Sequence, residues 1–430
     1  MHTEQLATVP DLLALHAAHR DRLPFLLMSS GEQGWDMLFS ASDLQLYHDG
    51  EGARFIDALR ALPLQPEPPP QGLPFGGGWF VYLGYDLLSE FEPTVAPAVP
   101  DSFPLAALAR VPAAFLVDRA RQQAWLVAET TTAAQSLRAL LLSTPTLVPR
   151  PVVLERLDED APAQYTDAVV RIKRYIREGD VFQVNISRGW QATLAEDVQP
   201  ADLFAALRRA NPAPFSALAD FGHAQIVSSS PERLVRVRDG WAETRPIAGT
   251  HPRSSDAAED AALKARLIGS LKERAEHVML IDLERNDLGR ISQPGTVEVN
   301  ELMAVASYAY VHHIESNVRG RLQPGVAPVD VVRALFPGGT ITGCPKVRTM
   351  QIIRELEPSA RRAYTGSLGY INRDGTMDLN ILIRTFMQQG QQLRFRAGGG
   401  IVADSDPQRE LEETRHKARG LLRALGVTGA

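Results

Sequence analysis

The chain has 430 residues, of which 44% are apolar and 22% charged, a composition that excludes a disordered or fibrous protein. Its 45 basic and 51 acidic residues give a net charge of −6, so the overall charge provides no attraction to nucleic acid or anionic lipid. Its one cysteine, Cys344, excludes an intrachain disulfide and a cysteine-built zinc site.

The N-terminal residues lack the basic segment and apolar core of a secretory signal. The most apolar stretch, residues 103–117, is interrupted by Arg110 and Pro112 and is too short to span a bilayer. We therefore expect a cytoplasmic protein with no membrane partner and no nucleic-acid partner.

Proline-rich segments divide the first part of the chain. Residues 63–70 and 93–104 have the composition of loops, and residues 143–162 have that of a linker. We place a boundary in this linker and expect an N-terminal region of residues 1–145 and a second region of residues 160–426.

After the linker, apolar spacing predicts helices and short strands in mixed order. The expected helices are residues 165–177, 256–287 and 407–425, and the expected strands are residues 181–186, 224–227, 234–237, 367–371, 379–383 and 393–395. Because strands and helices do not alternate strictly, the pattern favours an α+β fold over a doubly wound parallel sheet.

Two of the expected helices carry paired glutamates. Glu273 and Glu276 share one helix face, and Glu410 and Glu413 repeat the arrangement with Lys417 on the same side. Four converging carboxylates suit a hard cation such as Mg²⁺. Spacing alone favours the alternative of solvated helix faces with Glu–Lys pairs.

The remaining local patterns leave alternatives open. Residues 338–346 do not fit a phosphate loop and residues 397–400 do not fit a dinucleotide fingerprint, so both glycine clusters are interpreted as tight turns or as places of close backbone approach.

Two single residues also have more than one interpretation. His313 is either a core-edge histidine or a site residue. Arg384, at the end of an apolar strand, either extends to solvent or binds an anion. Cys344 lacks the glutaminase elbow and is interpreted as a packing residue.

Several of these segments together resemble the chorismate-utilising enzymes, in the same order along the chain. The matching segments are residues 179–186, 230–233, 243–250, 275–287, 338–346, 397–405 and 412–418. The resemblance covers everything after the linker. The N-terminal region is similar to that of the two ammonia-dependent branches, the large subunits of anthranilate synthase and aminodeoxychorismate synthase.

Between these branches, residues 75–86, 337–343, 380–384 and 398–405 are more similar to aminodeoxychorismate synthase component I. Ala248 instead favours anthranilate synthase, because many aminodeoxychorismate synthases carry lysine at this position. The resemblance implies amination of chorismate with ammonia to 4-amino-4-deoxychorismate, for p-aminobenzoate and folate synthesis. The alternatives are anthranilate synthase component I and a catalytically silent chorismate-binding subunit.

The resemblance further implies a large α+β fold with two packed β-sheet layers and surrounding helices, with Mg²⁺ as cofactor. Ammonia would come from a separate glutamine amidotransferase subunit. The glutamates matching the metal ligands are Glu276 and Glu413, with Glu410 and Glu273 beside them.

The resemblance assigns the other site residues as well. His313 matches a histidine near the departing C4 hydroxyl, a candidate general acid, and Arg384 and Tyr364 match the residues that hold the enolpyruvyl carboxylate. The expected catalytic residues are His313, Thr340 and Glu273, and the expected substrate-binding residues are Gly249, Thr250, Tyr364, Arg384, Gly398, Gly399, Gly400 and Lys417. Residues 26–29 and 211–215 resemble the two segments of the family's tryptophan pocket, with Met28 in place of a common acidic residue.

Overall fold

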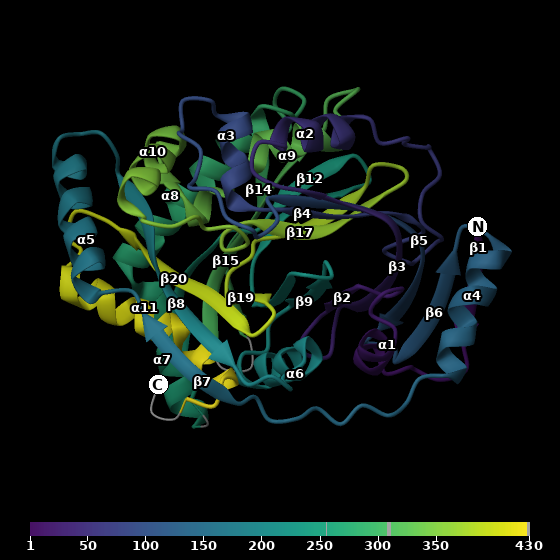
Figure 1. Cartoon of the computed structure of the whole chain (residues 1–430). Helices are drawn as coiled ribbons and strands as arrows, with labels where there is room; N and C mark the ends of the chain where they lie inside the picture. The colour runs from purple at the N-terminus through teal and green to yellow at the C-terminus, as the bar shows by residue number, and fades with distance from the viewer. Residues whose placement is uncertain (255, 308–310, 428–430) are drawn as a thin grey trace.

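The structure, a computed structural model, describes residues 1–254, 256–307 and 311–427; for residues 250–252, 272 and 311 it describes the backbone alone. Figure 1 shows long strands gathered into a large twisted sheet with helices around it. Every strand pairing among the described residues is antiparallel, from β1 with β6 to β7 with β8. This arrangement confirms the predicted α+β class, because a doubly wound fold requires parallel strands.

The N-terminal region forms the first part of the sheet and its small helices. In chain order these are β1 (His2–Leu6), α1 (Leu12–Ala18), β2 (Phe25–Met28), β3 (Trp35–Tyr47), α2 (Gly52–Arg60), β4 (Gly78–Leu83), the short turn η1 (Tyr85–Leu87), α3 (Leu88–Phe91), β5 (Ala106–Asp118), β6 (Gln123–Ala128) and α4 (Thr131–Leu142). The apolar stretch noted above forms most of β5, which is buried because β3, β4 and β6 all pair with it. Residues 63–70 and 93–104 lie outside helices and strands, as predicted.

The predicted linker is only partly correct. Residues 143–153 have no regular structure, but β7 (Leu154–Glu159) pairs with the next strand of the sheet, and α5 begins at Pro162. Leu154 and Leu157 pack against an apolar cluster, so burial of these side chains favours a strand where proline content indicated a loop.

The rest of the chain supplies the elements that carry the predicted site. They are α5 (Pro162–Arg177), β8 (Gln183–Leu194), α6 (Pro200–Ala210), β9 (Phe215–Asp220), β10 (Gln225–Ser230), β11 (Arg233–Arg238), β12 (Trp241–Thr244), β13 (Ile247–Pro252), α7 (Ala257–Gly269), α8 (Leu271–Gly289), β14 (Glu298–Ser307), β15 (Val311–Arg321), α9 (Pro328–Leu335), the turn η2 (Gly339–Ile341), β16 (Gly343–Cys344), α10 (Lys346–Leu356), β17 (Ser367–Asn372), β18 (Met377–Asn380), β19 (Thr385–Gln389), β20 (Gln392–Ile401) and α11 (Pro407–Ala424). The first and last predicted helices are confirmed to within a few residues.

The predicted single helix over residues 256–287 is wrong. It is interrupted at Ser270, which has extended backbone angles and ends α7. The Ser270 hydroxyl accepts a hydrogen bond of 3.3 Å from the Glu273 backbone N–H and so caps α8. A serine cap satisfies a donor at a helix start, and this local bond favours two helices over one.

The sheet joins the N-terminal region to the second region. β4 pairs with β17 along its whole length, and β2 pairs with β9. Phe25 of β2 stacks on Phe80 of β4 with ring centroids 3.8 Å apart, although these strands are not neighbours. The sheet therefore curves so that its faces pack together, as two packed layers require.

Helices α8 and α11 cover the part of the sheet where the predicted site residues lie. α11 packs on β20 and α8 packs on β13 and β15. Figure 1 shows α11 running across the lower end of β20 and β8, with α8 on the other side. Among the described helices, none is both long and apolar enough to cross a membrane.

Candidate active site

The glycine-rich strand β20 forms one wall of the candidate site. Gly398, Gly399 and Gly400 pair with residues 185–187 of β8. A Cβ at Gly399 would lie 3.4 Å from both Glu410 Oε2 and Glu413 Oε1 of α11, and 3.7 Å from Lys417 Nζ. The glycine thus allows the side chains of α11 to approach the backbone of β20 closely.

Strand β13, which pairs with β15 and packs on α8, carries a second group of the predicted site residues. Gly249 has a positive φ of +64°, and its Cβ would lie 2.9 Å from Glu273 Oε2 of α8. His313 of β15 is hydrogen-bonded through Nδ1 to the Gly249 carbonyl at 3.2 Å. Burial lowers the pKa of His313, so the imidazole is neutral at neutral pH and must take up a proton before it can donate one. Thr250 follows in β13, and its side chain lies outside the described residues.

Arg384 is close enough to both groups to interact electrostatically with Glu413 of α11 and with His313 of β15, and it also interacts with Tyr364. Tyr364 is buried and Arg384 is partly buried, and desolvation lowers the pKa of Arg384 while Tyr364 and Glu413 oppose that shift. Arg384 also influences the pKa of His313. A partly desolvated guanidinium is a strong site for a carboxylate, because the interaction is less screened by water than at the surface.

Glu232, which contacts Thr340, is a site residue with no role predicted from the sequence. The Thr340 hydroxyl donates a hydrogen bond of 2.5 Å to the buried carboxylate of Glu232. Burial raises the pKa of Glu232 to about 7, while the bond from Thr340 and the charge of Lys417 oppose this shift. A carboxyl group that titrates near neutrality inside a site can both give and take protons. The only sequence signal for Glu232 is its place in residues 230–233, one of the segments that resemble the family.

Gln183 is a second residue without a predicted role. Its Nε2 lies where a Cβ of Gly400 would be, at 2.1 Å, so the amide packs directly on the glycine strand. The side chain is buried, and its Oε1 has no hydrogen-bond partner in the described part of the chain. A buried acceptor in this position is available to a donor on a bound molecule.

The carboxylates fit a hard cation by their chemistry. Glu410 and Glu413 converge on Gly399, Glu273 lies at Gly249, and Glu276 lies one turn further along α8. Glu413 also pairs with Lys417 at 2.7 Å. Across residues 1–254, 256–307 and 311–427, however, no three His, Cys, Asp or Glu side chains lie together closely enough to hold a metal ion by themselves. A bound Mg²⁺ would therefore need oxygen atoms from substrate or water as well.

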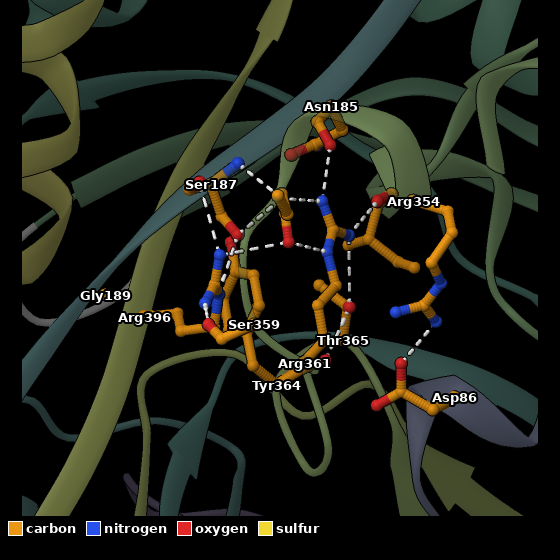
Figure 2. A network of polar contacts seen from close by, with 12 residues as sticks. Asp86, Asn185, Ser187, Gly189, Arg354, Ser359, Arg361, Tyr364, Thr365 and Arg396 are labelled. Carbon is orange, nitrogen blue, oxygen red and sulfur yellow. Dashed lines mark hydrogen bonds and ion pairs between the residues drawn. The ribbon is translucent and has the colours of Figure 1, made fainter. Parts of the chain in front are cut away.

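A buried ionic network supports the site from behind (Figure 2). The Glu357 carboxylate accepts hydrogen bonds from the Ser187 backbone N–H and hydroxyl, both at 2.8 Å, and pairs with Arg361 and Arg396. Burial alone would raise the pKa of Glu357, but the two guanidinium groups lower it to about 2. The network fixes β8 opposite Gly398 and links it to the turn that precedes Tyr364.

The chain is similar to known proteins over most of its length. Residues 23–423 match the family model described as chorismate binding enzyme. The chain is 42% identical over 363 residues to a Synechocystis protein named anthranilate synthase component I-like protein, covering 83% of this chain and 74% of that one. It is 40% identical over 368 residues to aminodeoxychorismate synthase component 1 of Salmonella typhimurium, covering 85% and 80%. Anthranilate synthase component I of Streptococcus pneumoniae matches the structure with a TM-score of 0.81 at 32% identity, covering 91% and 93%.

Proposed function

The chain belongs to the chorismate binding enzyme family and acts on chorismate, and from this premise we propose that it aminates chorismate with ammonia to 4-amino-4-deoxychorismate. In this proposal the protein is an aminodeoxychorismate synthase component I that requires Mg²⁺. The observation that carries the substrate assignment is the partly desolvated Arg384, which interacts electrostatically with Tyr364, with Glu413 of α11 and with His313 of β15. Chorismate bears two carboxylates, and Arg384 provides a fork for one of them.

The choice of the 4-amino product rests on segment similarity. Residues 75–86, 337–343, 380–384 and 398–405 are more similar to the aminodeoxychorismate branch. The Salmonella relative of that name supports it, whereas the Synechocystis relative carries the other name at nearly the same identity. Identity alone therefore does not separate the two reactions, and the product must be measured.

We assign Glu276 and Glu413 as the residues that would hold Mg²⁺, with Glu410 and Glu273 beside them. When bound, the ion would neutralise and orient the ring carboxylate. In the displacement, the ammonia nitrogen forms a bond to C4 and the C4–O bond breaks. The oxygen needs a proton to leave as water, and in this proposal His313 or the Thr340–Glu232 pair supplies it.

The ammonia would come from a separate glutamine amidotransferase subunit. The chain's one cysteine, Cys344, is half-buried in β16 directly before Pro345, and burial raises the pKa of its thiol. A glutaminase nucleophile needs a lowered pKa, because the thiolate is the reactive form. We propose that ammonium alone supports the reaction and that glutamine supports it only when such a subunit is added.

The second candidate function is that of anthranilate synthase component I, and Ala248 favours it. The deciding experiment incubates the purified chain with chorismate, ammonium and Mg²⁺, then adds aminodeoxychorismate lyase to half of the sample. p-Aminobenzoate formed only in the half with lyase supports the proposal. Anthranilate formed without lyase overturns it in favour of the second candidate.

A further inference from the structure

The N-terminal region supplies none of the predicted site residues, yet it contacts the turn that carries Tyr364. The Tyr85 backbone N–H donates to the Arg362 carbonyl at 2.7 Å. In return, the Arg362 N–H donates to Asp86 Oδ2 at 2.8 Å. The other oxygen of Asp86 accepts a hydrogen bond of 2.5 Å from Arg354 of α10, as Figure 2 shows. Asp86 therefore joins the turn to a helix of the second region.

The turn itself is held in an unfavourable backbone conformation. Arg362 has a φ of +49° and Thr365 a φ of +60°, the left-handed region that residues other than glycine seldom adopt. Such residues persist only where surrounding contacts fix them. The Arg362 side chain is fixed by Asp49, with bonds of 2.8 and 2.6 Å, and by Asp101 at 2.9 Å. All of these acidic partners belong to the N-terminal region.

Arg361 connects the fixed turn to Tyr364 through ring contacts. Its guanidinium lies over the Tyr85 ring at 4.6 Å and over the Tyr364 ring at 5.6 Å. Tyr85, next to Asp86 in η1, thus lies against the same guanidinium that Tyr364 packs on. Arg361 is anchored at its other edge by Glu357, so it has little freedom to follow a displaced turn.

We propose that Asp86 is a positioning residue, which holds the turn of residues 361–365 so that Tyr364 is oriented for the substrate carboxylate. The proposal rests on the proposed substrate-binding role of Tyr364. Loss of the Asp86 charge should weaken the hydrogen bond that the Arg362 N–H donates to residue 86, and it should leave Arg354 without a buried carboxylate partner. Substrate binding should suffer more than the chemical step, because Tyr364 contacts the substrate away from C4.

The test is Asp86→Asn, with Asp118→Asn as the matched control. Asp118 is also a buried aspartate of the N-terminal region, but its carboxylate accepts hydrogen bonds from Ala120 and Arg121 of its own turn. We expect Asp86→Asn to raise the KM for chorismate about tenfold and to change kcat less than about threefold. Amide hydrogen exchange in residues 361–366 should become faster than in the wild type. The control should show neither change.

A double substitution separates positioning from a general loss of stability. If Asp86 acts through Tyr364, adding Asp86→Asn to Tyr364→Phe should change KM less than about twofold. A full tenfold effect in that background overturns the proposal, as does unchanged exchange in the turn or an equal effect of Asp118→Asn. Should Asp86→Asn not fold, Arg354→Gln, on the more exposed side of the pair, is expected to shift KM and exchange in the same direction.

Failure of the proposed function is distinguishable from failure of this proposal. KM is followed by consumption of chorismate, which is the same for the 4-amino and the 2-amino product. If the wild type consumes no chorismate at all, the proposed function fails. The exchange rates of residues 361–366 then still decide whether Asp86 fixes the turn.

Discussion

Thr340 donates a hydrogen bond of 2.5 Å to the buried carboxylate of Glu232, and this bond joins the η2 turn to the segment between β10 and β11. Burial raises the pKa of Glu232 to about 7. The residue therefore changes charge in the pH range where most enzymes work, inside the site and against the Thr340 hydroxyl.

The first prediction concerns stability as a function of pH. Because the pKa of Glu232 is raised from 4.5 to about 7 by folding, the protonated group stabilises the fold below pH 4.5, and this contribution is lost as the pH rises to 7. Because glutamine stays neutral, we expect the free energy of unfolding of Glu232→Gln, relative to that of the wild type, to be higher at pH 8 than at pH 5. The expected increase is on the order of 3 kcal/mol. Urea denaturation at both pH values measures it, with the exposed Glu196→Gln as control. An equal difference at both values would contradict the prediction.

The second prediction concerns the metal. Glu276→Gln and Glu413→Gln should each abolish chorismate turnover without unfolding the protein, because a neutral amide weakens a hard-cation site while keeping the side-chain volume. The wild type should gain thermal stability on addition of Mg²⁺ and these variants should not. Glu412→Gln is the control, since Glu412 lies next to Glu413 but pairs with Arg415. Near-normal turnover by Glu276→Gln or Glu413→Gln at limiting Mg²⁺ would refute the assigned site.

Local patterns predicted the elements whose stability is local. The helix of residues 165–177 and the final helix were predictable because their apolar spacing is regular over several turns. The break at Ser270 was missed because one capping bond decides it. Strand β7 was missed because its formation depends on β8, more than 30 residues away in the chain.

The same distinction applies to the site. Family resemblance indicated Arg384 and Tyr364, but no local pattern indicates that Glu232 accepts a bond from Thr340, since 108 positions separate them. Its raised pKa follows from burial, which the motif of residues 230–233 does not reveal. The role of Asp86 was likewise not predictable from local sequence, because its partners Arg354 and Arg362 lie far along the chain.

The third prediction concerns the anion-binding residue. Arg384→Lys keeps a positive charge but loses the planar fork that binds a carboxylate through two bonds. We expect the KM for chorismate to rise about a hundredfold, a change that corresponds to two charge-assisted hydrogen bonds. Steady-state kinetics of chorismate consumption provide the measurement. Arg409→Lys, on the exposed face of α11, should leave KM unchanged. A KM within twofold of the wild type would remove Arg384 from the binding site.

The fourth prediction concerns tryptophan. A cavity of about 870 Å³ is lined by residues from both segments that resemble the family's tryptophan pocket, among them Met28, Ser29 and Phe215. Met28 offers no carboxylate to an ammonium group, so we expect tryptophan to be absent or to bind without strong inhibition. Initial rates with and without micromolar tryptophan check this. Strong inhibition would contradict the prediction and favour the anthranilate reaction.

The last prediction concerns Ala248, which lies buried in β13 next to Gly249. Family members with lysine there can attack C2 of chorismate with the amine, and ammonia then displaces the adduct at C4. Alanine has no nucleophile, so the chain should form the 4-amino product without a covalent adduct at this position. Intact-protein mass spectrometry during turnover should show the unmodified mass.

The matched variant is Ala248→Lys, which restores an amine beside Gly249. We expect a mass increase that maps to residue 248 in this variant and no such increase in the wild type. Cleavage of the protein and mass analysis of the peptide that contains residue 248 locates the modification. A substrate-derived adduct on any lysine of the wild-type chain during turnover would show that another amine performs the attack, because Ala248 itself cannot.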